Sequence, residues 1–187
     1  MGKKPYIANY ESALSFMTRD QHDAAFEVLQ RALSQVPENE MTGDNAAYLN
    51  ILSQLSFLFL ERRELERAYD HVSKGLEAKK DHADLLFLKS LVMFDLNRYD
   101  EMLEAIINYL VAIDEGNAHL FDYRFVNPGI FKELFERLIP KAYQCSFQHE
   151  QIRDIVYKLY SATGNERFKK TYEIMVNIDN TTSREEH

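Results

Sequence analysis

Residues 46–76 read AAYLNILSQLSFLFLERRELERAYDHVSKGL and contain two helical periods in succession. Apolar residues recur every three or four positions in each half: Leu49, Leu52, Leu55 and Phe59, then Leu65, Ala68, Val72 and Leu76. This spacing places each set on one face of an α-helix. The polar run 61–64 between them suits a short turn. The stretch therefore predicts a pair of helices joined by a tight connection.

The same spacing continues outward on both sides of this stretch. It predicts helices at about 6–18, 22–35, 45–60, 65–79, 83–96 and 99–113, and again at about 130–139, 140–147, 149–163 and 166–178. Six glycines and four prolines in 187 residues are too few for the many turns of a β-sandwich or barrel. We therefore expect an all-α globular chain.

The predicted helices come in pairs that repeat. Ala68 and Met102 hold the same place in successive pairs, 34 residues apart. Ala25 precedes Ala68 by 43 residues, and residues 37–45 account for the difference as a nine-residue insertion. Small side chains allow two antiparallel helices to approach closely, and they recur at the expected crossings: Ala13, Ser56 and Ser90 in the first helices, Ala25 and Ala68 in the second.

A 34-residue period of helix–turn–helix units resembles the tetratricopeptide repeat, or TPR, family over about residues 6–115. The resemblance implies a right-handed superhelix of antiparallel helix pairs. It also implies a concave inner surface, lined by the first helix of each pair, that binds other proteins. We expect residues 1–187 to form a single helical repeat domain.

The C-terminal third departs from this pattern. Residues 116–129 form an aromatic loop in which Phe121, Tyr123 and Phe125 alternate with charged residues. Its aromatic side chains either cover the open face of the third pair or contact a ligand. Residues 130–180 then read as capping helices that close the array, because terminal repeats are atypical. The polar segment 180–187 is expected to fray.

The sequence offers no convincing catalytic, cofactor or metal site. His119 and Asp122 lack a third ligand. Cys145 and His149 would face the same side of a shared helix, but a buried cysteine beside an exposed histidine is the preferred interpretation. The sequence lacks the signature motifs of nucleotide-binding loops, zinc proteases and serine hydrolases. We therefore expect no cofactor and no enzymatic activity.

Charge restricts the classes of partner. The chain carries 30 acidic and 22 basic residues, net −8, which disfavours nucleic acids and anionic membranes. Residues 38–115 hold 16 acidic and 8 basic residues, so the whole excess lies in the second and third pairs. The lone Cys145 cannot form an internal disulfide, and no apolar segment follows Lys3 and Lys4 as in a signal peptide. A cytoplasmic protein is expected.

The resemblance assigns a second stripe of the first helices to a partner-binding groove. Its predicted residues are Tyr10, Leu14, Met17, Asn50, Gln54, Phe57, Glu61, Asp84, Phe87, Leu91, Phe94 and Asp95. Some TPR proteins hold a peptide carboxylate with basic and amide side chains in this groove. The aromatic, apolar and acidic residues found here instead favour an apolar or basic segment.

Three functions remain open at this stage. The first is a protein-interaction module or adaptor that binds a peptide or helix of another protein in the groove. The second is a structural or assembly protein that forms homo-oligomers through its aromatic helices. The third is a helical accessory to an enzyme, because repeats of this kind occur beside catalytic domains such as glycosyltransferases.

Overall fold

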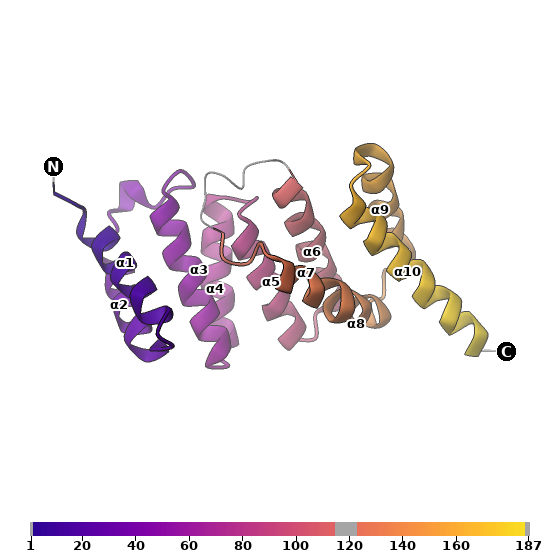
Figure 1. Ribbon diagram of the computed structural model, residues 1–187, viewed down its shortest axis with the longest axis horizontal. Helices are drawn as coiled ribbons and strands as arrows, with labels where there is room; N and C mark the ends of the chain where they lie inside the picture. The colour runs from indigo at the N-terminus through magenta and orange to yellow at the C-terminus, as the bar shows by residue number, and fades with distance from the viewer. Residues whose placement is uncertain (1, 115–122, 186–187) are drawn as a thin grey trace. The chain divides into compact units, whose positions relative to one another are not determined.

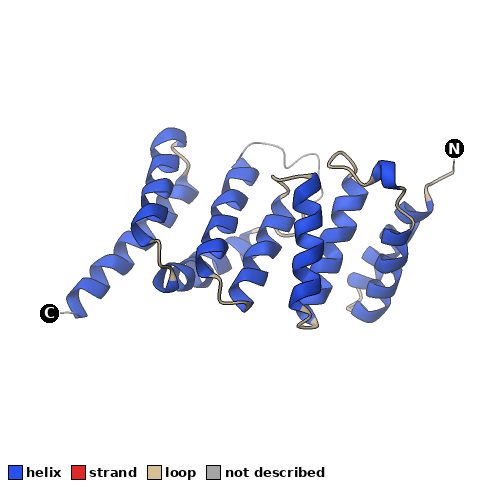
Figure 2. Ribbon diagram, turned by 180° about the vertical axis from the view of Figure 1, so that it is seen from behind, coloured by secondary structure: helices blue, strands red, loops and turns tan. Residues whose placement is uncertain are grey.

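The computed structural model describes residues 2–114 and 123–185, and within these ranges the chain is helical and contains no strand (Figure 2). The predicted helices are confirmed, most with ends within one or two residues of those expected. The α-helices are α1 (Pro5–Met17), α2 (His22–Ser34), α3 (Ala46–Glu61), α4 (Leu65–Ala78), α5 (Ala83–Asp95), α6 (Tyr99–Asp114), α7 (Pro128–Glu133), α8 (Ile139–Cys145), α9 (His149–Thr163) and α10 (Glu166–Glu185).

The chain divides into two compact units, Met1–Val92 and Met93–His187. Their boundary falls inside α5, so this helix contributes residues to both units. Each unit has its own set of packed helices.

The first unit contains two helical hairpins, α1 with α2 and α3 with α4 (Figure 1). Helix α2 also packs against α3, which joins the hairpins. The small residues predicted at the crossings are fully buried: Ala13, Ala25, Ser56 and Ala68 are all 0% exposed. Ser56 satisfies its hydroxyl by donating a hydrogen bond to the carbonyl of Leu52 at 2.8 Å. The helix spacing in this unit therefore follows from the small side chains that the sequence places there.

The nine-residue insertion is an ordered connection. It contains a short 3₁₀-helix, η1 (Glu38–Glu40), and its Gly43 lies so close to α4 that an added Cβ would sit 2.4 Å from the carbonyl oxygen of Ala78. Only glycine allows this backbone approach without movement. Asn45 ends the insertion and caps α3, since its side-chain oxygen accepts a hydrogen bond from the amide of Tyr48.

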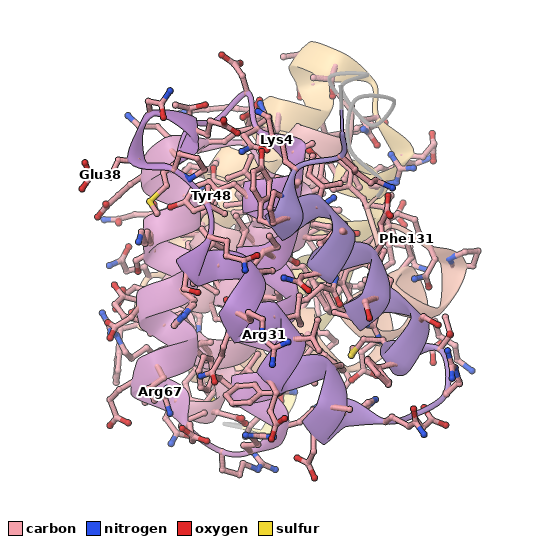
Figure 3. The ribbon with its side chains drawn as sticks, turned by 90° about the vertical axis from the view of Figure 1, so that its left-hand side faces the viewer. Lys4, Arg31, Glu38, Tyr48, Arg67 and Phe131 are labelled. Carbon is pink, nitrogen blue, oxygen red and sulfur yellow. The ribbon has the colours of Figure 1, made fainter. Side chains whose placement is uncertain are left out.

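Polar residues from the N-terminus anchor this insertion. Lys4 Nζ and the Tyr6 hydroxyl both donate to Glu40 Oε2, at 2.7 and 2.6 Å, and Asn45 Nδ2 donates to the Tyr6 hydroxyl at 3.2 Å. The bonds from Lys4 and Tyr6 lower the pKa of Glu40, whereas burial, followed by the bond to Glu40, raises the pKa of Tyr6. Figure 3 shows Lys4 on the same side of the unit as the insertion, with Glu38 projecting away from the helices.

In the second unit, α6 packs against α8, and α10 packs against both α8 and α9. The break predicted between helices ending at 139 and starting at 140 is wrong. Residues Leu134–Leu138 instead form a π-helical turn, η3, that links α7 to α8 without interruption, and the amide of Ile139 donates to the carbonyl of Leu134. Pro140 explains the widened turn, because its ring would clash with the carbonyl four residues earlier in a regular α-helix.

The C-terminal hairpin ends later than predicted. Gly164 adopts a left-handed conformation, φ 66°, and terminates α9 as expected. Helix α10, however, continues to Glu185, beyond the predicted end at about residue 178. Thr181 and Thr182 each donate a side-chain hydrogen bond to the carbonyl of Ile178. A polar sequence can remain helical where its side chains satisfy backbone carbonyls in this way.

The aromatic loop is described only from residue 123, and Phe121, His119 and Asp122 lie outside the described residues. Phe125 is 7% exposed, and its carbonyl accepts a hydrogen bond from the hydroxyl of Tyr109 on α6 at 2.6 Å. Asn127 then caps α7 by accepting from the amide of Ile130 at 3.1 Å. The burial of Phe125 and its bond to Tyr109 favour a packing role for this residue over contact with a ligand.

His82, at the entry to α5, makes the first unit sensitive to acid. It is 0% exposed, and its Nδ1 accepts a 3.4 Å hydrogen bond from the amide of Leu85. Burial, reinforced by Lys79 and opposed by Asp81, lowers its pKa from 6.5 to about 4. The unfolded chain therefore binds a proton at higher pH than the folded chain does. The contribution of the neutral His82 side chain to the stability of the folded state is complete above about pH 6.5. This contribution is lost as the pH falls toward 4.

We expect His82→Asn to reduce this pH dependence, because an asparagine oxygen can still accept from Leu85 but does not titrate. Between pH 7 and 4 the parent protein should lose about 2–3 kcal/mol of unfolding free energy more than the variant. Urea denaturation at a series of pH values measures the difference. His71, whose pKa is lowered by partial burial, titrates in both proteins and cancels. If the unfolding free energies of the parent and the variant change equally with pH, His82 is not the group responsible for the loss of stability in acid.

Candidate partner-binding surface

The twelve predicted groove residues differ widely in accessibility. Five of them are buried: Met17, Asn50, Gln54, Asp84 and Phe87. Tyr10, Leu14, Phe57, Leu91, Phe94 and Asp95 are partly exposed, and Glu61 is exposed. Ten of the twelve belong to the first unit, whereas Phe94 and Asp95 belong to the second. The accessible members of the first unit are therefore the ones that can contact a partner without a change in packing.

Asp84 and Phe87 are the largest departures from the expected groove. They are 1% and 3% exposed, so neither presents a contact surface in this structure. A helical stripe shows which residues share a face, but it does not show how much of that face neighbouring segments cover.

Phe57 lies in a small cluster at the C-terminal end of α3. The imidazole of His22, at the start of α2, meets the Phe57 ring edge to face, with ring centroids 6.3 Å apart. His22 Nδ1 also lies 2.7 Å from a carboxylate oxygen of Glu61, one turn beyond Phe57. The Phe57 ring thus packs against His22, beside the Glu61 carboxylate, and the residue remains partly exposed. An apolar surface edged by a carboxylate suits an apolar side chain next to a cation.

A second contact strengthens the junction between α2 and α3. Arg62 Nη2 binds Asp23 at 2.5 Å, and its guanidinium lies 3.7 Å from the ring centroid of Phe26. Neither His22 nor Arg62 was predicted from the sequence as part of this surface. Their proximity could have been predicted from the repeat pattern. When helix pairs stack, the start of the second helix of one pair lies beside the end of the first helix of the next pair.

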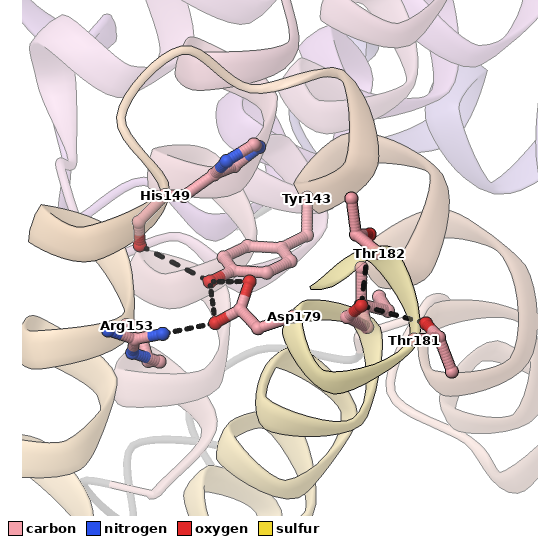
Figure 4. A network of polar contacts seen from close by, with 7 residues as sticks. Tyr143, His149, Arg153, Asp179, Thr181 and Thr182 are labelled. Atoms are coloured by element: carbon pink, nitrogen blue, oxygen red, sulfur yellow. Dashed lines mark hydrogen bonds and ion pairs between the residues drawn. The ribbon is translucent and has the colours of Figure 1, made fainter. Parts of the chain in front are cut away.

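A different polar cluster joins three helices of the second unit (Figure 4). The hydroxyl of Tyr143 on α8 donates to Asp179 on α10, at 3.0 Å to Oδ2, and Arg153 on α9 binds the same carboxylate. Burial, then the bond to Asp179, raises the pKa of Tyr143, while Asp179 raises the pKa of Arg153. Both side chains therefore keep their protons at neutral pH. This cluster ties the C-terminal helices to one another.

The candidate nucleophile is not supported by geometry. Cys145 is the last residue of α8, and His149 is the first of α9, so the two do not share a helix. The ring of His149 contacts Tyr143 instead, with centroids 4.9 Å apart. Across residues 2–114 and 123–185, no group of three or more metal-binding side chains converges.

No family model and no curated protein matches the sequence. The structure is similar to a crystal structure from Podosopora anserina described as a kinesin light chain with nearly identical TPR-like repeats. The TM-score is 0.57 at 12% identity, over 98% of this chain and 100% of that chain. A single-residue variant of that protein gives the same values.

This chain has a TPR-like repeat fold. The fold predicted from the 34-residue period is thereby confirmed, although the sequence identity is too low to carry any property of the matched protein beyond its fold. None of the described helices is long and apolar enough to cross a membrane.

The difference in burial between Phe57 and Phe87 gives a direct test of the site's geometry. We expect Phe87→Ala to lower the free energy of unfolding by about 3–5 kcal/mol, because it empties a buried position. Phe57→Ala should cost only about 1–2 kcal/mol, since its ring already meets solvent. Urea unfolding of both variants provides the measurement. Equal losses would mean that Phe57 is as enclosed as Phe87 and is no contact surface.

Proposed function

We propose that this protein is an interaction module that binds a segment of a partner protein through the inner face of its TPR-like helices. Residues of that face in the first unit that remain accessible are Tyr10, Leu14, Phe57, Glu61 and Leu91. The observation that carries the proposal is the partly exposed Phe57 ring, held beside Glu61 by His22. A TPR-like fold supplies a scaffold of the kind that presents such residues to other proteins.

The expected partner segment is apolar or basic. Phe57 and Leu14 offer apolar contact, and Glu61 places a carboxylate at the edge. A lysine or arginine next to a large apolar side chain would satisfy both features. No catalytic role is proposed, because the polar clusters described above hold helices together. The single cysteine is compatible with action in the cytoplasm.

Self-association is the second candidate, and exposed apolar side chains on α9 favour it. Ile155 and Tyr157 are 48% and 51% exposed. Sedimentation over a range of concentrations separates the two functions, because a homo-oligomer that uses these residues dissociates on dilution and an adaptor stays monomeric without its partner.

Site-specific photo-crosslinking in native cells tests the adaptor proposal. A photoreactive phenylalanine analogue at position 57 or 14 should form the same partner adduct, because both positions belong to the proposed face. The analogue at position 70, an exposed residue of α4, is the matched control and should not form it.

Purified partner then allows a quantitative check. Phe57→Ser should weaken binding about tenfold or more, as expected for a central aromatic contact, while the helical circular dichroism is retained. Adducts of equal yield from positions 57 and 70, or a partner bound equally by the Phe57→Ser variant and its parent, would rule out this face.

A further inference from the structure

A cleft of about 400 Å³ lies within the second unit, between α6 and the N-terminal part of α9. Three isoleucines supply its apolar lining, namely Ile107 on α6 with Ile152 and Ile155 on α9. Three carboxylates of α6 stand along the same cleft: Asp100, Glu101 and Glu104. This volume falls in the range of sites that hold small ligands or a few side chains of a partner.

Hydrogen bonds join the first turn of α6 to the turn that precedes α9. Asp100 Oδ1 accepts from the hydroxyl of Ser146 and from the amide of Phe147, the latter at 3.2 Å. The Ser146 hydroxyl in turn accepts from the amide of Gln148 at 3.0 Å. Because these bonds fix the turn before α9 against the first turn of α6, the cleft is formed before any partner arrives.

Two exposed apolar side chains lie at this cleft or next to it, Ile155 and Phe147. In the part of the chain that the structure describes, the large hydrophobic residues that are exposed are Phe147, Ile155 and Tyr157. Ile155 lines the cleft, and Phe147, 96% exposed, borders an adjoining hollow of about 170 Å³ that shares Asp100 and Glu101 with it. An apolar strip rimmed by polar groups is typical of an interaction site.

The charge of the cleft is negative. Arg98 binds Glu101 through two hydrogen bonds of 2.6 Å, which neutralises one carboxylate. Glu104 is exposed and forms no ion pair with the described residues, and the residues that line the 400 Å³ cleft include no lysine or arginine. A ligand for this cleft must therefore bring both apolar surface and positive charge.

We propose that the α6–α9 cleft binds a segment of a partner protein that presents large aliphatic side chains flanked by lysine or arginine. The aliphatic groups would cover Ile107, Ile152 and Ile155, and the cations would meet Glu104 and Asp100. A second copy of this chain fits less well, because a two-fold contact would enclose the carboxylates of both copies in one interface. This surface lies on α6 and α9 and is independent of the proposed site at Phe57.

Fluorescence anisotropy with a synthetic peptide tests the proposal on the full chain. The probe is a short labelled helix with leucines at positions i, i+3, i+4 and i+7 and lysines elsewhere, and its counterpart carries glutamate in place of lysine. The lysine peptide should bind and the glutamate peptide should not. Ile155→Ser and Glu104→Lys should each weaken binding about tenfold or more.

Two matched variants serve as controls. Tyr157→Ser changes an equally exposed residue of α9 that does not line the cleft, and Glu173→Lys makes the same charge change on α10. Both should keep the parent affinity, and all four variants should retain the parent circular dichroism. The proposal is overturned by any of three results: no binding of the lysine peptide at about 1 mM, equal losses in control and cleft variants, or self-association of the protein that Ile155→Ser abolishes.

Discussion

Close approach of antiparallel helices at small, fully buried side chains is the constraint on which the first unit depends. Ala13, Ala25, Ser56 and Ala68 have no exposed surface, and larger neighbours such as Leu29 and Phe59 fill the space around them. Dense packing of this kind leaves no room to exchange a small residue for a large one without moving a helix. The spacing of the helices then determines which residues of α1 and α3 stay at the surface.

Much of this architecture could be predicted from the sequence, because hydrophobic periodicity reports directly on helices and their pairing. The 34-residue separation of Ala68 and Met102, together with Ala25 in register before the insertion, indicated the repeat. The π-turn before Pro140 could not be predicted in the same way, because it depends on which carbonyl the proline ring would meet. The continuation of α10 depends on contacts such as that of Asp179 with Tyr143, which join residues far apart in the sequence.

The candidate site was predicted less completely than the fold. Periodicity placed Phe57, Asp84 and Phe87 on equivalent stripes, yet Phe57 is partly exposed and the other two are buried. Accessibility depends on the segments that cover a helix, and residue spacing carries no information on them. The acidic cleft beside Ile155 escaped the sequence analysis for a similar reason, since α6 and α9 are separated by the aromatic loop and by two further helices.

Stability of Ala68→Leu, compared with Ala8→Leu, tests the packing constraint most directly. Ala68 is buried in the second hairpin, whereas Ala8 is an exposed residue of α1 with the same helical environment along the backbone. The account predicts that Ala68→Leu lowers the free energy of unfolding by about 1–3 kcal/mol and that Ala8→Leu changes it by less than about 0.5 kcal/mol. Equal stability of the two variants in urea denaturation would contradict it, because the helices would then not be in close contact at that side chain.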